Sequence, residues 1–357
     1  MIYSLSHQPG RWMFWDGSAF LYFSGTSYLG LANDPVFHEK LTASISQYGS
    51  NFGSSRIGSM RLDIYDKTEQ MLAGYLQQEK ALTVSSGTLA GILAYRVFDS
   101  KGELIFAPNA HPALWLQIPA SFKTREDWEE TCLTKSYQSG PPLFIYSNAI
   151  DSLQVIPYNF NWLHQLGDKR EIILVLDESH TLGIRGKDGT GVLPSLTLPG
   201  HIQGVMIGSM GKAMGIPAGL IAGNTHWINE IWQSPHFGGA SPASPAYLET
   251  WTQLQSHYTS LRKILKQNMV QFEQLTGETN PLLRSIPGYP VHFSKSPTLA
   301  DHLFKNKIFV SHFPYPTSKD EPITRIVLSS LHQEEDIRLL ADTLSGEQTK
   351  PPFAPNF

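Results

Sequence analysis

The sequence predicts an α/β protein in which a mostly parallel β-sheet lies between helices and a smaller second domain follows. Six short apolar runs, rich in Ile, Val, Leu and Phe, alternate with longer amphipathic stretches. The runs lack a regular polar alternation, which is typical of strands buried on both faces of a parallel sheet. The chain has 357 residues, enough for about two domains of ~150 residues. The expected strands are 81–86, 103–108, 141–148, 171–178, 203–209 and 219–224.

A long helix is expected to begin near Pro245 and to end at Gly277. Its apolar residues recur at steps of three, four or seven, so they form one stripe along the helix. We expect this helix to lead from the sheet domain into the second domain. The residues of the stripe are Tyr247, Trp251, Leu254, Tyr258, Leu261, Leu265, Phe272 and Leu275.

The second domain is expected to be a smaller α+β unit. Its sequence contains an apolar strand at 324–330 and an amphipathic helix at 333–344, and residues 350–357 are expected to form an extended tail. The expected domains are residues 1–40, an N-terminal segment that packs with the small domain, then 41–245, the large domain, and 246–357, the long helix and the small domain.

Composition excludes several classes of function. The net charge is −4 and no basic patch stands out, so nucleic acid is not an expected partner. Cys132 is the single cysteine, so neither an intrachain disulfide nor a multi-cysteine metal site is expected, and we expect a buried free thiol. The N-terminus lacks a signal-peptide pattern, and no apolar run approaches the ~20 residues of a membrane span. We therefore expect a soluble, cytoplasmic protein without metal.

Polar residues follow four of the expected strands directly, in the segments 85–88, 108–111, 177–180 and 208–212. In open parallel sheets, ligands bind at the carboxyl ends of the strands, so chemistry is sought in these four loops.

Two of these loops carry charged residues beside apolar strands. Asp177 and His180 follow a strongly apolar run, where a carboxylate is costly to bury without a partner; a helix cap or a simple turn is the alternative explanation. Lys212 lies between Gly211 and Gly215 after another apolar run, which suits a lysine that forms a Schiff base. Its alternative is a lysine whose stem lies along the apolar strand end while its amine reaches solvent.

The other two loops give weaker signals. Gly87 and Thr88 precede a helical stretch, and small residues at a helix N-terminus can bind an anion through free N–H groups. An ordinary cap by Ser86 or Thr88 explains the same pattern. His111 follows a strand, where a histidine is usually structural. Together, a phosphate-type turn, a histidine, Asp-x-x-His and a glycine-flanked lysine follow one another at successive strand ends.

This order resembles the α-oxoamine synthase family of fold-type-I pyridoxal 5'-phosphate (PLP) enzymes. The resemblance covers nearly the whole chain, and its blocks appear in the family's order. They read YLGLANDP, YGSNFGSSRIGS, VSSGTLAG, LDESHTLGIRGKDGTG, GSMGKAMGIPAG and a C-terminal block, FVSHFPYPTSKDEPITRIVLSSLHQEEDI, with its arginine and histidine. The resemblance implies a large domain with a mostly parallel seven-stranded sheet between helices, a smaller α+β domain, and PLP as cofactor.

The resemblance also implies roles for the residues that match each motif. Lys212 would be the Schiff-base lysine, and Asp177 would pair with the pyridinium nitrogen. His111 would stack on the ring, and His180 and Ser152 would lie near its phenolic oxygen. The phosphate would bind Gly87, Thr88 and Ser209, with Ser241 reaching the phosphate of a neighbouring subunit. Arg325 would grip the amino-acid carboxylate, a task that suits a bidentate guanidinium, and Thr26 would lie near the amino-acid substrate.

The implied reaction condenses a small amino acid with an acyl thioester, of CoA or of acyl carrier protein, and loses CO₂ to leave an α-oxoamine. The implied assembly is a homodimer with shared active sites. Two alternatives remain open from the sequence: an aminotransferase on the same fold, and a PLP-fold protein without catalytic activity. Intact Lys212, Asp177 and Arg325 argue against the second alternative.

Three departures from the family pattern bear on the reaction. Thr26 stands where the family often has asparagine, and Tyr65 stands where it commonly has histidine. Around Ser152, the usual glycine and Met-Asp are replaced by Ala149 and by Leu153–Gln154. The departures leave the amino acid, the acyl chain and the carrier open.

Overall fold

The computed structural model describes residues 3–119, 122–277, 281–314 and 319–346. The chain forms two compact units. The large unit comprises Glu39–Ile150 and Tyr158–Gln255, and the small unit comprises Met1–His38, Asp151–Pro157 and Ser256–Phe357.

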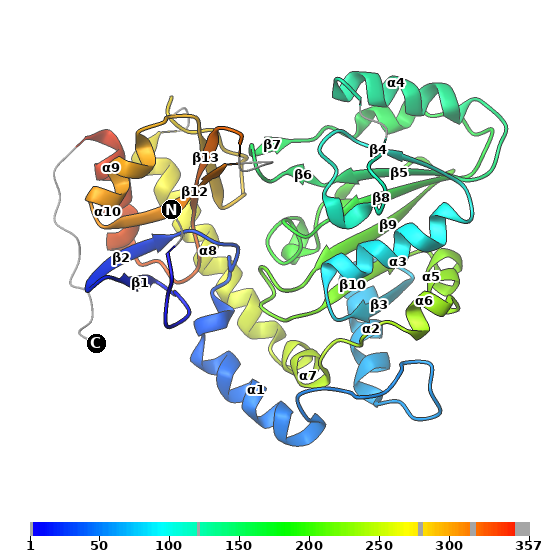
Figure 1. Ribbon diagram of the computed structural model, residues 1–357, viewed down its shortest axis with the longest axis horizontal. Helices are drawn as coiled ribbons and strands as arrows, with labels where there is room; N and C mark the ends of the chain where they lie inside the picture. Colours follow the sequence, from blue (N-terminus) through cyan, green and yellow to red (C-terminus); the bar gives the residue numbers. More distant parts are fainter. Residues whose placement is uncertain (1–2, 120–121, 278–280, 315–318, 347–357) are drawn as a thin grey trace. The chain divides into compact units, whose positions relative to one another are not determined.

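The large unit is built on a mixed sheet with the strand order β3-β10-β9-β8-β5-β4 (Figure 1). Strands β4, β5, β8 and β9 are parallel neighbours, whereas β10 runs antiparallel to both β9 and β3. The parallel strands therefore end at one edge of the sheet. Their bounds are β3 Lys80–Val84, β4 Glu103–Phe106, β5 Leu143–Asn148, β8 Ile172–Asp177, β9 Ile202–Ser209 and β10 Gly219–Gly223.

The predicted α/β class is confirmed, and all six predicted strands form. The seven strands implied by the resemblance are not reached, because the sheet has six strands among the described residues. Between β4 and β5 the described residues form the 3₁₀ turn η2 (Pro112–Leu114) and α4 (Arg125–Ser136), with no strand. Pro112 begins the turn, and a proline lacks the N–H that a strand needs for its ladder.

Helix α3 (Gly87–Asp99) packs its apolar face on the sheet. Ala90, Leu93, Ala94, Val97 and Phe98 are buried in the core that the strands share. The Phe98 ring stacks on Phe144 of β5 with 4.5 Å between ring centroids, and burying one such side chain contributes ~1.5–3 kcal/mol. This packing holds α3 against the sheet along its length. The other helices of this unit are α2 Asp63–Tyr75, α4 Arg125–Ser136, α5 Thr225–Trp232, α6 Pro235–Gly238 and α7 Pro245–Gln253, with 3₁₀ turns η2 Pro112–Leu114, η3 Asn161–Gln165, η4 Lys187–Gly189 and η5 Leu193–Ser195.

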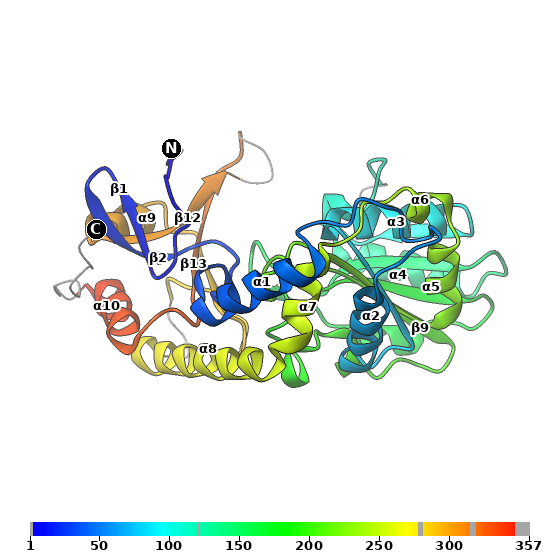
Figure 2. The same ribbon diagram turned by 90° about the horizontal axis from the view of Figure 1, so that it is seen from below.

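The small unit has a five-stranded sheet with the order β1-β2-β12-β13-β11. Only β2 and β12 are parallel; the other pairs are antiparallel. Figure 2 shows α8 lying along one side of these strands, with α10 at its C-terminal end. The elements are β1 Trp12–Trp15, β2 Ser18–Phe23, η1 Leu31–Asn33, β6 Ile150–Asp151, β7 Ile156–Pro157, α8 Gln255–Thr276, β11 Val291–Ser294, α9 Leu299–Lys305, β12 Ile308–Pro314, β13 Pro322–Val327 and α10 Glu334–Ser345; α1 Pro35–Tyr48 begins in this unit and continues into the large one.

The prediction of one long helix from Pro245 to Gly277 is wrong in one respect. The segment forms two helices, α7 and α8, because Leu254 between them has φ −105° and ψ 22°. The side-chain amide of Gln255 donates to the Trp251 carbonyl, which satisfies an acceptor at the end of α7. The end at Gly277 is confirmed, since α8 stops at Thr276 and Gly277 has φ +78°. The predicted strand at 324–330 and the helix at 333–344 correspond to β13 and α10, while the predicted tail lies outside the described residues. Within the described part of the chain, no helix is both long and apolar enough to cross a membrane.

Candidate active site

Lys212 lies in a closed turn between β9 and β10. The backbone N–H of Met210 donates to the Ala218 carbonyl at 2.9 Å, and the N–H of Ile216 donates back to Met210 at 3.1 Å. Gly215 has φ +67°, a conformation that favours glycine. Met210, Ala213, Met214 and Ile216 are buried, so the turn is anchored in the core while Lys212 itself is half-buried. The turn therefore holds the lysine at a fixed place beside the end of β9.

Gly87 begins α3 directly against the end of β9. A Cβ atom at Gly87 would lie 2.7 Å from the Ser209 Cβ and 2.9 Å from its Cα, so no larger residue fits without moving backbone. Ser86 caps the helix by accepting a hydrogen bond from the Leu89 N–H at 3.1 Å. The first N–H groups of a helix have no partner within it, and here they belong to Gly87 and the exposed Thr88. The close approach brings this helix start and Ser209 together in one corner, and free N–H groups at a helix start are suited to an anion.

Ser241 is exposed, and its backbone lies beside the same corner. Its carbonyl accepts a hydrogen bond from the Ser85 N–H at 3.1 Å. The loop of Ser241 is held by Tyr65, whose hydroxyl donates to the Ala243 carbonyl at 2.8 Å. The Arg56 guanidinium lies 4.0 Å from the centroid of the Tyr65 ring, and burial raises the pKa of Tyr65 to about 12. Tyr65, which departs from the family pattern, is thus a buried residue whose hydroxyl holds the loop of Ser241 in place.

Asp177 ends β8 between Asn148 of β5 and Ile207 of β9. Its Oδ1 accepts a hydrogen bond from the Ser179 N–H at 2.8 Å, and the Ser179 hydroxyl accepts one from the Ser209 N–H at 2.9 Å. The turn after β8 is therefore linked to the end of β9 by side chains. His180 follows in this turn and is half-buried.

His111 follows β4, and its position is set by Asn148. The His111 N–H donates to Asn148 Oδ1 at 3.1 Å, and the Asn148 amide donates to the Asn109 carbonyl at 2.8 Å. Desolvation by its surroundings lowers the pKa of His111; the charge of Asp177 opposes this shift, and the charge of Lys212 adds to it. Asp177 and Lys212 are thus both near enough to His111 to act on its ring, and the lowered pKa favours the neutral ring.

The acid beside Asp177 has a structural role. Glu178 is completely buried, and its carboxylate accepts hydrogen bonds from the Thr181 hydroxyl and from the N–H groups of Val192 and Leu193. Burial raises the pKa of Glu178 to about 7, although these hydrogen bonds lower it. Glu178 therefore ties the loop before η5 to the end of β8.

The remaining predicted residues, Thr26, Ser152 and Arg325, belong to the small unit. Thr26 is half-buried in the loop after β2. Ser152 is half-buried in the β6–β7 hairpin, where the neighbouring Leu153 and Gln154 donate backbone hydrogen bonds to Asp151 Oδ1. Their roles stay predictions.

Arg325 lies on β13, between β11 and β12, and is 5% exposed. Its Nε and Nη2 are buried without a hydrogen-bond partner among the described residues, and no described carboxylate forms an ion pair with it. A buried guanidinium is costly without a partner. These two nitrogens form the side-on edge that binds a carboxylate through two parallel bonds. The small unit therefore contains a ready carboxylate-binding group.

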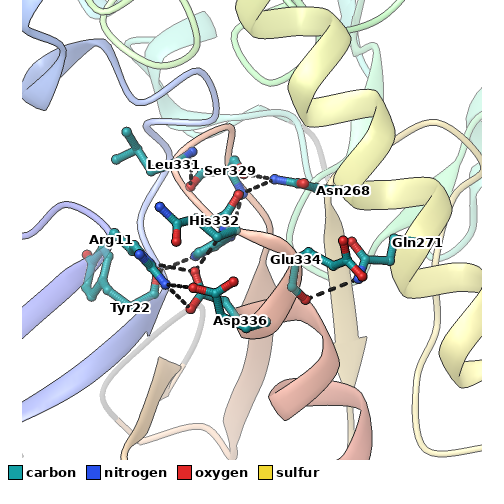
Figure 3. Close-up of polar contacts among 11 residues, drawn as sticks. Arg11, Tyr22, Asn268, Gln271, Ser329, Leu331, His332, Glu334 and Asp336 are labelled. Atoms are coloured by element: carbon teal, nitrogen blue, oxygen red, sulfur yellow. Dashed lines mark hydrogen bonds and ion pairs between the residues drawn. The ribbon is translucent and has the colours of Figure 1, made fainter. Parts of the chain in front are cut away.

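The loop after β13 is fixed by His332, the second of the two histidines in the C-terminal block (Figure 3). Its Nδ1 accepts from the Ser329 N–H at 3.0 Å, and its Nε2 lies 3.0 Å from the Tyr22 carbonyl, so the ring donates there. Burial lowers the pKa of His332 to about 4, so the ring is neutral. Asn268 of α8 donates to the carbonyls of Ser329 and His332, both at 2.9 Å.

Sequence reasoning missed three residues that organise these sites: Asn148, Ser179 and His332. Asn148 is the polar residue that ends an apolar run, which is the signal that singled out Asp177. Ser179 stands inside the Asp-x-x-His segment. His332 lies in the C-terminal block, but the sequence assigns it no role, because one of its backbone partners, Tyr22, is distant in the chain.

Comparison with known proteins identifies the protein family to which the chain belongs. Residues 159–344 match the family model described as aminotransferase class I and II, and the chain belongs to this family. The predicted resemblance to α-oxoamine synthases and the predicted PLP cofactor are confirmed.

Individual proteins resemble this chain in sequence or in fold. A curated relative, the 8-amino-7-oxononanoate synthase of Thermosipho melanesiensis, is 23% identical over 94% of this chain and 90% of its own length. Serine palmitoyltransferase from S. paucimobilis, solved with bound PLP–myriocin, has a TM-score of 0.80 at 14% identity and matches 97% of this chain and 92% of its own. The 8-amino-7-oxononanoate synthase of Francisella tularensis has a TM-score of 0.70 at 22% identity, covering 92% and 97%. These solved structures share the fold.

Proposed function

We propose that this chain is a PLP-dependent acyltransferase that condenses a small amino acid with an acyl thioester, with loss of CO₂, to give an α-oxoamine. We further propose the reaction of 8-amino-7-oxononanoate synthase in biotin biosynthesis, with alanine and a pimeloyl thioester as substrates. The observation that carries the proposal is the group of Lys212, Asp177, His111 and Gly87 at one edge of the sheet. The name shared by the curated relatives supports the particular reaction.

The residues present fit PLP. The corner offers the backbone N–H groups of Gly87 and Thr88 and the hydroxyl of Ser209 to a phosphate, and the contact at Gly87 excludes a Cβ. Asp177 offers a carboxylate to a pyridinium nitrogen, and neutral His111 offers a flat ring to the cofactor face. Lys212 lies in the anchored turn, where its amine would hold the cofactor covalently. We propose for Thr88, His180, Ser152 and Ser241 the cofactor contacts that the family resemblance implies.

PLP, when bound, supplies an electron sink for the negative charge that develops on the amino-acid α-carbon. The protein's own task is to position and to move protons. Once the amino group of the substrate had displaced Lys212 from the cofactor, the free Lys212 amine would take the α-proton, a step in which a positioned base contributes ~10²–10⁴-fold. Arg325 holds the substrate carboxylate through Nε and Nη2, and holding both reactants in place contributes up to ~7–11 kcal/mol. Thr26 contacts the amino-acid substrate.

The proposed partners are the amino acid, a CoA or acyl-carrier-protein thioester, and a second copy of the chain. In this homodimer Ser241, which is exposed on its loop, reaches the phosphate of the other subunit. We propose the cytoplasm as the location.

The test supplies purified holoprotein with alanine and pimeloyl thioesters of CoA and of acyl carrier protein, and it measures free thiol and CO₂. We expect stoichiometric thiol and CO₂ release with at least one carrier. Turnover of alanine with a 2-oxo acid, without thiol release, would instead identify an aminotransferase. A protein that shows no absorbance of bound PLP would support a fold kept for a role other than catalysis. A screen of other small amino acids and acyl chains on the same assay defines the substrates.

A further inference from the structure

Two buried tyrosines accompany Arg325 inside the small unit. Tyr28, from the segment YLGLA, has no exposed surface, and Tyr289 is 2% exposed. Their hydroxyl oxygens lie 3.3 Å apart. We propose that Tyr28 and Tyr289 are positioning residues that hold the Arg325 guanidinium so that its Nε–Nη2 edge receives the carboxylate of the substrate. This inference rests on the proposed function and adds the group that makes the small unit selective for an α-carboxylate.

The chemistry of the three groups sets the direction of their hydrogen bonds. Burial raises the pKa of Tyr28, while the charge of Arg325 and hydrogen bonds with Tyr289 and Arg325 lower it in part. A guanidinium only donates, so the Tyr28 oxygen must accept from Arg325. The Tyr28 proton then has Tyr289 within reach.

Neutral partners leave the charge of Arg325 available. A carboxylate from the protein would orient the guanidinium equally well, but it would also neutralise it and compete with the substrate. With its pKa raised, Tyr28 stays protonated at pH 7 and contributes only an oxygen lone pair. The described ion pairs include none to Arg325, and its unpaired nitrogens are the two of the bidentate edge. The pairing thus fixes orientation and preserves charge.

Backbone contacts lock Tyr28 in place beside Arg325. The Ser330 N–H donates to the Tyr28 carbonyl at 3.0 Å, and Ser330 stands in the loop that His332 and Asn268 fix (Figure 3). A Cβ atom at Gly30 would lie 2.4 Å from the Leu331 Cγ, so the segment after Tyr28 fits closely against the same loop. The loop that follows β13, the strand of Arg325, therefore also holds Tyr28.

The test measures amino-acid binding to the holoprotein from the absorbance change of bound PLP, without any thioester. Alanine is compared with alaninamide, which has the same side chain and amine but no carboxylate charge. We expect the wild type to prefer alanine and Tyr28→Phe to reduce this preference by ~10- to 100-fold, the size of a hydrogen bond to a charged group. The matched control is Tyr22→Phe, because the Tyr22 hydroxyl is paired with Ser24; it should keep the wild-type preference.

Tyr289→Phe provides a second variant should Tyr28→Phe fold poorly, and it should lower the same ratio by a smaller factor. Equal weakening of alanine and alaninamide in these variants would show a merely structural role and overturn the inference. A wild type that discriminates between the ligands, together with tyrosine variants that discriminate as well, would overturn it and leave the proposed function intact. A wild type that binds neither ligand would contradict the proposed function itself.

Discussion

The candidate sites of the two units differ in how far their polar groups already have hydrogen-bond partners within the protein. In the large unit, the groups around Lys212 are backbone and side-chain atoms that already bond one another, as in the link from Asp177 through Ser179 to Ser209. In the small unit, Arg325 is buried with two nitrogens that have no partner among the described residues. The site in the large unit is thus a set of groups that hydrogen-bond one another. The site in the small unit is a buried positive charge without a negatively charged partner among the described residues.

This difference fits the ligands that we propose for the two sites, PLP in the large unit and the amino-acid carboxylate in the small unit. A cofactor that stays through many turnovers is best held by fixed groups and close packing. Such groups lose little conformational entropy when the cofactor binds, because they are already ordered. A substrate that arrives and leaves needs a strong but exchangeable contact, and an unpaired guanidinium edge provides one. The comparison predicts that damage to the small unit affects amino-acid binding, whereas damage to the large unit affects cofactor binding.

The largest effect is expected from Arg325→Ala. Removing one partner of a buried charged pair costs ~2–5 kcal/mol, or roughly 30- to several thousand-fold in affinity. The KM for the amino acid should rise by this order, while the KM for the thioester changes far less. Arg338→Ala is the control, because Arg338 lies exposed on α10 in an ion pair with Glu334. Equal increases in both KM values would show that the carboxylate role is misplaced.

A smaller effect is expected from Gly87→Ala. The added Cβ would meet the Ser209 backbone, which cannot rotate away, and overpacking of this kind costs ~1–3 kcal/mol. PLP affinity, measured by fluorescence titration of the apoprotein, should fall by about tenfold or more. Amino-acid affinity of the fully loaded protein should change little.

Gly74→Ala is the matched control for this substitution. Gly74 lies in α2, and a Cβ there would meet nothing within 4 Å. Alanine is favoured over glycine in a helix by ~0.5–1 kcal/mol, so this variant should bind PLP normally and melt at the same or a higher temperature. Unchanged PLP affinity in Gly87→Ala would remove the phosphate corner from the account.

The smallest effect is expected from Glu178, through the pH dependence of stability. Because the folded chain raises the pKa of Glu178 from 4.5 to about 7, folding favours the protonated acid. The resulting stability is present below pH 4.5 and is lost as pH rises to about 7. The melting temperature of the wild type should therefore fall over this window by a few degrees more than that of Glu178→Gln.

Glu130→Gln serves as the control, since Glu130 is exposed on α4. It should keep the wild-type slope of melting temperature against pH. Identical slopes for Glu178→Gln and the wild type would mean that the buried acid does not titrate in this window.

Much of the fold follows from local patterns in the sequence. The six strands of the large sheet are apolar runs of the expected length, and Gly277 ends α8 through its positive φ. The break at Leu254 carries no such signal, because the apolar stripe continues through it at helical spacing. The implied seventh strand rested on the resemblance alone, because the sequence of the large domain contains only six apolar runs that predict strands.

The residues of the candidate site can be predicted from the sequence where a reactive or charged side chain follows an apolar run that ends a strand. Asp177, His111 and Lys212 stand directly after apolar runs, so they were found from sequence. Asn148 and His332 act through backbone atoms of segments remote in the chain, and such bonds leave no periodic trace. Tyr28 looks like an ordinary core residue in sequence, and only its hydroxyl's partner distinguishes it.

The most direct test of the central claim, that Lys212 carries PLP, is site-mapped reduction. The holoprotein is treated with borohydride and digested, and the peptides are sequenced by mass spectrometry. We predict a pyridoxyl label on Lys212 alone and no label in Lys212→Ala. A label on another lysine, or a label that persists in Lys212→Ala, would contradict the account.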